Sequence, residues 1–334
     1  MEEARRAIAR VPLRRPVVYG VVHNELYFLP AFFEHYRALG VELFLVLDDR
    51  STDGTSEFLR KQPDCIVLTS SLRYGDRIDG QRVAHLWKNA IPHLFLDDHW
   101  AIVADADEFL FLPPGFRNIS EFSAALDARG ISAVIGSMVD FYPATVGELS
   151  APGSPADCRA LFSAYPYFDE GPYFRWRENG VRPFVLHGGV RERLLRKFAI
   201  DKRRFDRTGV RLWIRRLKGW VRPERNFVWV TKVPLVRWSP NKRYVNAHAL
   251  NQSPDRSIAL AIAHFKFTSY LDRKIDTAIA SRAHAGGSRA YFAYAELLSA
   301  MRAGDGSFLW EGSRRFDGPE SLVVARLLEG FPSS

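Results

Sequence analysis

Two aspartates, Asp105 and Asp107, flank Ala106 directly after an apolar run at residues 100–104. Two carboxylates placed so closely at the end of a buried strand offer hard oxygen ligands to Mg²⁺ or Mn²⁺, ions that keep several waters and bind substrate phosphates. The alternative is that both carboxylates only cap the strand and remain solvated. Acidic residues at the ends of other predicted strands favour the metal site.

These further carboxylates follow the first two predicted strands. Glu25 comes after the β-branched run at 17–22, and Asp48 and Asp49 close the strand predicted at 41–47. In open α/β sheets, ligands bind beyond the carboxyl ends of the strands. We therefore expect these carboxylates and the Asp105/Asp107 pair to face one ligand site.

The hydrophobic pattern predicts the elements that position these residues. Strands are expected at 17–22, 41–47, 65–69, 100–104 and 131–139. Helices are expected at 26–39, at 82–95, at 121–128 and as a short helix that ends at Leu59. Strands that alternate with helices indicate an α/β fold with a mostly parallel, Rossmann-like sheet flanked by helices.

The rest of the chain is less regular. Residues 141–190 are rich in proline, glycine and aromatic side chains, a composition typical of long ordered loops. A strand pair or extended segment is expected at 228–238, a strand or short helix at 259–268, and helices at 271–283 and 290–301. We divide the chain into an N-terminal core (1–190), a basic segment (191–225) and a helical C-terminal part (226–334).

The composition is that of an ordinary globular protein. Of the 334 residues, 47% are hydrophobic and 25% are charged, which excludes disordered and collagen-like classes. No uncharged apolar run approaches the roughly 18 residues that a membrane-spanning helix needs. The charged N-terminus lacks an apolar signal core, and the two cysteines, Cys65 and Cys158, fit a reducing compartment, so we expect a cytoplasmic protein.

The positive charge of the chain is local. The net charge is +9, and residues 191–225 hold 14 basic and four acidic residues, so the rest sums to −1. Between Val210 and Arg222 an apolar face that contains Trp213 is edged by arginines, as in helices that lie on a membrane surface. We expect peripheral attachment to an anionic membrane; the alternative is a charged surface helix that packs on the domain. Nucleic acid is not expected, because no nucleic-acid-binding motif is present.

Motifs of other enzyme classes are missing, and those present resemble a known family. The chain has no P-loop, no dinucleotide-binding glycine motif, no zinc-protease motif and no serine-hydrolase motif. Its motifs follow the order and spacing of family-2-like glycosyltransferases with the GT-A fold, and resemble most the bacterial branch in which the acidic motif reads DADEF and a late segment reads HFKF. These motifs are residues 21–25, 49–55, 105–109 and 264–267, and matches at 188–191 and 232–235 extend the resemblance across most of the chain. The resemblance implies that residues 1–190 are the nucleotide-sugar-binding core and that residues 226–334 complete the acceptor and metal site.

The resemblance implies a role for each matching residue. Glu25 and Asp49 would hold the base and ribose of a nucleotide-diphosphate sugar, UDP- or GDP-linked, and Arg82 is a candidate for its phosphates. Asp105 and Asp107 would bind Mn²⁺ or Mg²⁺ on the diphosphate, with Asp107 the more direct ligand.

A histidine from the C-terminal half often completes the metal site of such enzymes. The resemblance makes His264 the first candidate and His248 the second. The alternative for His264 is a core histidine with satisfied hydrogen bonds.

The reaction implied is single displacement with inversion. The metal neutralises the departing diphosphate while a hydroxyl of a saccharide or lipid-linked acceptor, in envelope polysaccharide synthesis, attacks the sugar with help from a carboxylate base. The usual acidic motif for this base is not legible. Asp140, at the end of the strand at 131–139, and Glu192, after the Gly188-Gly189 turn, are the candidates, followed by Asp169 and Glu178.

Two other classes remain open at this point. A nucleotidyltransferase or a metal-dependent phosphohydrolase also combines an α/β sheet with paired aspartates. A sugar-activating nucleotidyltransferase would have a glycine-rich loop with Arg and Lys after the first strand, where this chain has His23-Asn24-Glu25-Leu26. A non-catalytic carbohydrate-binding or membrane-scaffold protein is the second alternative, and the intact Asp105 and Asp107 argue against it.

Overall fold

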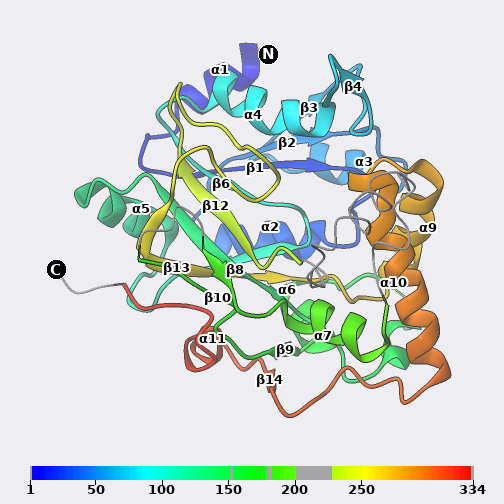
Figure 1. The fold of residues 1–334 in the computed structure, drawn as a ribbon. Coiled ribbons are helices and arrows are strands. Elements are labelled where there is room, and N and C mark those ends of the chain that lie inside the picture. The colour runs from blue at the N-terminus through cyan, green and yellow to red at the C-terminus, as the bar shows by residue number, and fades with distance from the viewer. Residues whose placement is uncertain (1, 151–152, 179–182, 201–227, 332–334) are drawn as a thin grey trace, which may run out of the picture.

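The computed structural model describes residues 2–150, 153–178, 183–200 and 228–331 (Figure 1). Within these residues, eight strands form one sheet in the order β3-β2-β1-β6-β12-β8-β13-β7. The strands are β1 (Val17–Val22), β2 (Phe44–Asp48), β3 (Cys65–Thr69), β6 (Trp100–Val103), β7 (Glu108–Phe111), β8 (Ala133–Asp140), β12 (Thr231–Arg237) and β13 (Asp255–His264).

The sheet combines a parallel half with a mixed half. Strands β3, β2, β1 and β6 are parallel neighbours, whereas β12 lies antiparallel between β6 and β8. Beyond them β13 pairs parallel with β8 and antiparallel with β7. The prediction of an α/β fold with a large, mostly parallel, Rossmann-like sheet is confirmed.

Helices cover both faces of this sheet because the strands are apolar on both sides. On one face, α1 (Glu2–Ala9) and α4 (Val83–Phe95) pack on one core cluster through side chains such as Ile8 and Trp87. On the other, α2 (Leu29–Ala38), α3 (Thr55–Arg60), α5 (Ile119–Ala128), α6 (Cys158–Ala164) and α7 (Gly189–Lys197) pack on the larger cluster. Gly20 lets β1 approach β6, since a Cβ there would lie 2.8 Å from the Ala104 carbonyl oxygen.

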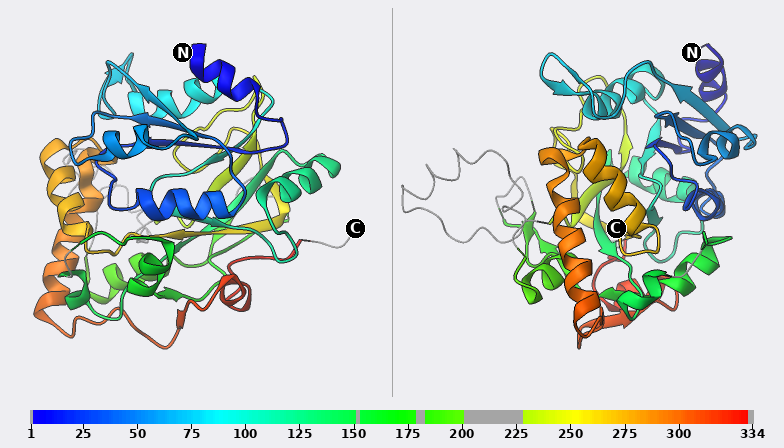
Figure 2. Two further views of the ribbon diagram at one scale, coloured as in Figure 1. Left: turned by 180° about the vertical axis from the view of Figure 1, so that it is seen from behind. Right: turned by 90° about the vertical axis from the view of Figure 1, so that its right-hand side faces the viewer.

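Two helices of the C-terminal part stand at one end of the sheet (Figure 1). Helices α9 (Leu271–Ser281) and α10 (Ala285–Ala303) lie side by side there (Figure 2). Near its start α10 is interrupted at Gly286, Gly287 and Ser288, which have φ values of 63°, 66° and 64°. The smaller elements are η1 (Val146–Ser150), the hairpin β4 (Arg77–Ile78) and β5 (Gln81–Arg82), the pair β10 (Phe174–Arg175) and β11 (Phe184–Val185), the pair β9 (Tyr167–Asp169) and β14 (Ser313–Arg315), and α11 (Pro319–Val324).

Most predicted elements are present, but two expectations need correction. Residues 108–111 form strand β7, which the acidic motif at its start concealed. The region 141–190 contains α6 and short strands rather than loops alone. Of the two alternatives expected at 259–268, a strand or a short helix, the strand is present as β13, and with β12 it joins the same sheet as the strands before residue 190.

The basic segment is described only at its beginning. The part that was expected to lie on a membrane, residues 210–222, falls outside the described residues. In α7, by contrast, the basic side chains are bound within the protein: Arg191 pairs with Asp140, Arg193 with Asp169, Arg196 with Glu192 and Lys197 with Asp305. In the described part of the chain, no helix has the length and apolar character needed to cross a bilayer.

A buried histidine makes the fold sensitive to acid. His35 on α2 lies between the rings of Phe109 and Phe111, and its Nε2 donates to the Leu110 carbonyl oxygen at 2.8 Å. Burial lowers the pKa of His35 to about 4. The unfolded chain therefore binds a proton at a higher pH than the folded chain does, and stability must fall as the pH drops below about 6.5.

We predict that His35 contributes roughly 3 kcal/mol to the loss of stability between pH 6.5 and pH 4. Replacing His35→Gln removes the titrating group, so the free energy of unfolding should depend less steeply on pH in this range. Urea denaturation at several pH values measures this slope. An unchanged slope in the variant would contradict the assignment, whatever its absolute stability.

Candidate active site at the carboxyl ends of the strands

A buried ion pair fixes the position of the acidic turn that follows β6. Lys232 of β12 is 1% exposed, and its ammonium binds the carboxylate of Glu108, whose side chain is 2% exposed. The same Glu108 oxygen accepts from the backbone N–H of Asp105 at 3.0 Å. Lys232 also lies 3.5 Å from Asp105 Oδ2. The turn that presents Asp105 and Asp107 is thus fixed by side chains on two different strands.

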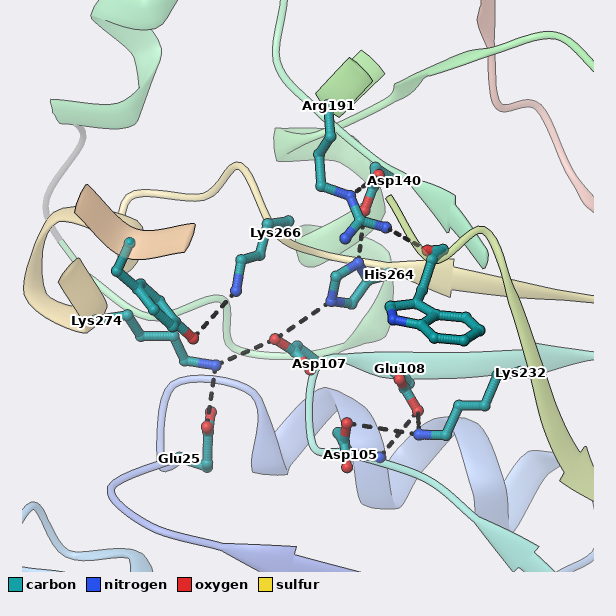
Figure 3. Close-up of polar contacts among 12 residues, drawn as sticks. Glu25, Asp105, Asp107, Glu108, Asp140, Arg191, Lys232, His264, Lys266 and Lys274 are labelled. Carbon is teal, nitrogen blue, oxygen red and sulfur yellow. Dashed lines mark hydrogen bonds and ion pairs between the residues drawn. The ribbon is translucent and has the colours of Figure 1, made fainter. Parts of the chain in front are cut away.

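Asp107 points to the other side of this turn, towards the C-terminal part (Figure 3). Its Oδ2 lies 3.1 Å from the ammonium of Lys274 on α9 and 3.8 Å from Nε2 of His264. Burial opposes ionisation of Asp107, but Lys274 and His264 outweigh it and hold its pKa below the ordinary value. Asp107 is therefore a carboxylate at neutral pH.

His264 is oriented by a carboxylate behind it. It is the last residue of β13, paired in register with Glu108 of β7 and Asp140 of β8. Its Nδ1 donates to Asp140 Oδ1 at 2.6 Å, and its Nε2 lies towards Asp107. In the neutral form of the ring, this bond leaves the lone pair of Nε2 facing the Asp107 carboxylate, an arrangement of two acceptors that suits a cation.

Asp140 binds both Arg191 and His264. Its Oδ2 accepts from Arg191 Nε at 2.5 Å and its Oδ1 from His264, while Arg191 Nη2 donates to the Trp229 carbonyl oxygen at 3.1 Å. Burial would raise the pKa of Asp140, yet Arg191 and His264 keep it lowered. Both oxygens of Asp140 thus accept hydrogen bonds from side chains of the protein, and the role of Asp140 as a general base stays a prediction.

Glu192, the other base candidate, caps a helix. One of its oxygens accepts from the Gly188 backbone N–H at 2.5 Å and the other from Arg196 at 2.7 Å. A carboxylate in the first turn of a helix is stabilised by the N–H groups that have no partner there. Asp169 accepts hydrogen bonds from Arg193, Tyr142 and Trp310. Glu178 is exposed.

Glu25 and Asp49 each bury one oxygen without a partner. Glu25 Oε1 lies 3.0 Å from Lys274, and Asp49 Oδ2 accepts from the Tyr74 backbone N–H at 2.9 Å. Among the described residues, Glu25 Oε2 and Asp49 Oδ1 have no hydrogen-bond partner. Burial raises the pKa of Glu25 to about 7 although Lys274 opposes the rise. Unpaired buried acceptors are costly, so these two atoms are positions where a ligand would donate.

Arg82 and His248, two further candidates, lie beside the site. Arg82 directly precedes α4. Burial and nearby lysines lower the pKa of His284 to about 4, and the positive charge of Arg82 adds to this effect. His248 stacks on Trp229 with ring centroids 5.1 Å apart, and burial together with Lys232 keeps its pKa well below the ordinary value. Of the two candidate histidines, His264 rather than His248 lies against Asp107.

The expected metal set is brought together only in part. Asp107 and His264 meet, but Asp105 turns towards Lys232, because the turn after β6 sends the two aspartates to different lysines. Within the described ranges, no group of three or more His, Cys, Asp or Glu side chains is arranged to hold a metal ion. A cation at Asp107 and His264 would therefore take its other ligands from water or substrate, as Mg²⁺ and Mn²⁺ commonly do.

The sequence analysis assigned no role to the cations of the site. Lys232, Lys266, Lys274 and Arg191 surround the carboxylates in Figure 3. Lys232 carried a signal, since it is a charged residue among mainly apolar residues within a segment predicted as a strand. Lys274 carried none, because a lysine in the first turn of a helix is ordinarily exposed.

Comparisons with known proteins add little. No family model matches the chain, and no curated protein matches it. Among solved structures, UDP-glucose pyrophosphorylase complexed with UDP-glucose matches with a TM-score of 0.22 and 9% identity. The match covers 41% of this chain and 60% of that enzyme, which is less than two thirds of its length. A likeness this weak carries no functional argument.

The buried pair under the acidic turn leads to a stability prediction. Replacing Lys232→Met leaves the Glu108 carboxylate buried without its counter-ion, which should lower the free energy of unfolding by about 3–5 kcal/mol. Adding Glu108→Gln to this variant removes the unpaired buried carboxylate and should restore part of the lost free energy of unfolding. Urea denaturation of the two variants measures both effects. The exposed Lys61→Met is the matched control and should change stability by less than about 0.5 kcal/mol. A loss no larger than the control, or no recovery in the double variant, would contradict the role of the pair.

Proposed function

We propose that this protein is a metal-dependent glycosyltransferase that uses a nucleotide-diphosphate sugar. The observation that carries the proposal is the meeting of Asp107 and His264, in which a histidine with a fixed tautomer faces a carboxylate at the end of β6. The motifs at 21–25, 49–55 and 105–109 resemble those of family-2-like glycosyltransferases and end β1, β2 and β6 at the same edge of the sheet. Substrates of open α/β sheets bind at this edge.

The donor's nucleoside would bind at the ends of β1 and β2. Asp49 Oδ1 and Glu25 Oε2 are buried acceptors that need donors, which a base N–H or ribose hydroxyl would supply. His23 adds rigidity here, since its Nδ1 donates to the Asp49 carbonyl oxygen at 2.7 Å. Arg82 is placed beside this region and would contact the phosphates.

Asp107 and His264 would hold the divalent cation, with Asp105 close enough to act through water. When bound, Mn²⁺ or Mg²⁺ supplies positive charge to the leaving diphosphate. Asp140 would act through His264 by keeping the proton on Nδ1, and Arg191 would keep Asp140 ionised. Residues 226–334, which provide His264 and Lys274, would complete this side of the site and receive the saccharide acceptor.

Nucleotide binding tests the site. We predict that, from a panel of UDP, GDP, TDP and the monophosphate CMP, one of the three diphosphates raises the melting temperature, and that Mn²⁺ increases the shift. The variant Asp107→Asn should lose the Mn²⁺-dependent part because the cation loses a charged ligand. Asp97→Asn is the matched control, since Asp97 is exposed at the opposite end of β6. Retention of the Mn²⁺-dependent shift in Asp107→Asn would exclude this metal position.

The products identify the reaction class. A glycosyltransferase incubated with Mn²⁺ and its nucleotide sugar should slowly release the nucleoside diphosphate, with water as a poor acceptor. The variant His264→Ala should be at least about tenfold slower. Chromatography separates this product from the nucleoside monophosphate or inorganic phosphate that a nucleotidyltransferase or phosphohydrolase would release, and either of the latter products would refute the proposal.

A further inference from the structure

Lys274 lies between two carboxylates of the candidate site. Its ammonium is 3.0 Å from Glu25 Oε1 and 3.1 Å from Asp107 Oδ2, and its side chain is 17% exposed (Figure 3). The rings of Phe28 and Tyr270 lie 5.0 Å and 5.6 Å from the ammonium. These aromatic contacts favour a cation at this point, so the position of the charge is well defined.

The position of this ammonium conflicts with a bound metal ion. The oxygen of Asp107 that contacts Lys274 is the same Oδ2 that faces His264 Nε2 at 3.8 Å. A divalent cation between Asp107 and His264 would therefore lie next to the ammonium, and like charges at such short range repel strongly.

Besides Asp107, the ammonium has one anionic partner in the site, and a bound nucleotide would add a second. Glu25 already contacts it through Oε1, and among the described residues Glu25 Oε2 has no partner. The diphosphate of a nucleotide bound beside Asp107 would supply further oxygens. A metal–nucleotide complex therefore replaces the ion pair between Lys274 and Asp107 with one between Lys274 and the phosphate oxygens. A metal ion alone brings no anion to replace that ion pair.

We propose that Lys274 is a built-in counter-cation for Asp107: it excludes a free divalent cation and moves to the phosphate oxygens when the cation arrives with a nucleoside diphosphate. Lys274 is thus a positioning residue that selects the metal–nucleotide complex over the free cation. The inference rests on the proposed function, because it takes Asp107 and His264 as the residues that hold the cation.

Titration of the full chain with Mn²⁺ tests the inference, since electron paramagnetic resonance counts free Mn²⁺ without any turnover. Wild-type protein should bind Mn²⁺ weakly alone and at least tenfold more tightly with saturating UDP or GDP. Lys274→Met should bind Mn²⁺ alone at least tenfold more tightly than wild type, and the effect of the nucleotide should shrink by a similar factor. Lys274→Gln should behave in the same way and serves if the methionine variant does not fold.

Lys266→Met is the matched control. Lys266 also brings positive charge close to Asp107, but its ammonium donates to the Tyr291 hydroxyl at 3.2 Å. The control variant should change Mn²⁺ affinity less than threefold if contact with Asp107, rather than general charge, excludes the metal. An equal gain in Lys266→Met would overturn the inference.

The same titration distinguishes a failure of the role of Lys274 from a failure of the metal position. If wild type binds Mn²⁺ with nucleotide, loses this binding in Asp107→Asn, and yet Lys274→Met matches wild type within threefold, the role of Lys274 is wrong and the proposed function stands. If neither wild type nor Lys274→Met binds Mn²⁺ with or without UDP or GDP, the metal position fails and the inference fails with it.

Discussion

Carboxylates that are gathered at one edge of a sheet must be balanced by cations, because burial penalises each negative charge. Here the ends of β1, β6 and β8 bring Glu25, Asp107 and Asp140 together. Lys274 pairs with Glu25 and Asp107, and Arg191 pairs with Asp140. Lys232 pairs with the buried Glu108. Each cation comes from an element outside the four parallel strands β1, β2, β3 and β6. The charge balance therefore joins the C-terminal part and α7 to the core of the sheet.

The antiparallel strands have a clear function in this arrangement. Strand β12 enters the sheet between β6 and β8 and carries Lys232 beneath the acidic turn, and β13 ends at His264 beside that turn. A purely parallel sheet would leave both positions to crossover helices on the faces. A mixed sheet instead places charged side chains at the level of the strand ends, where backbone pairing fixes them firmly.

The sequence predicted the strands with a strong pattern and failed where polar residues interrupted it. The runs at 17–22 and 65–69 match β1 and β3, since continuous apolar runs between turn residues have few other interpretations. Strand β7 was missed because Glu108 at its start belongs to the acidic motif. Asp140 and Glu192 were expected as bases, yet both are bound by residues distant in sequence or by a helix end, and residue type alone does not reveal such partners.

The sequence by itself determined the class of fold and the acidic residues that end its strands, because periodicity and chain order are properties of local sequence. Only the tertiary structure decided which charges meet. Asp105 and Asp107 are two residues apart but turn to lysines 127 and 167 residues further on, at positions 232 and 274. Such pairings depend on the order of strands in the sheet and on where α9 docks, and these follow from packing of the whole chain rather than from any local pattern.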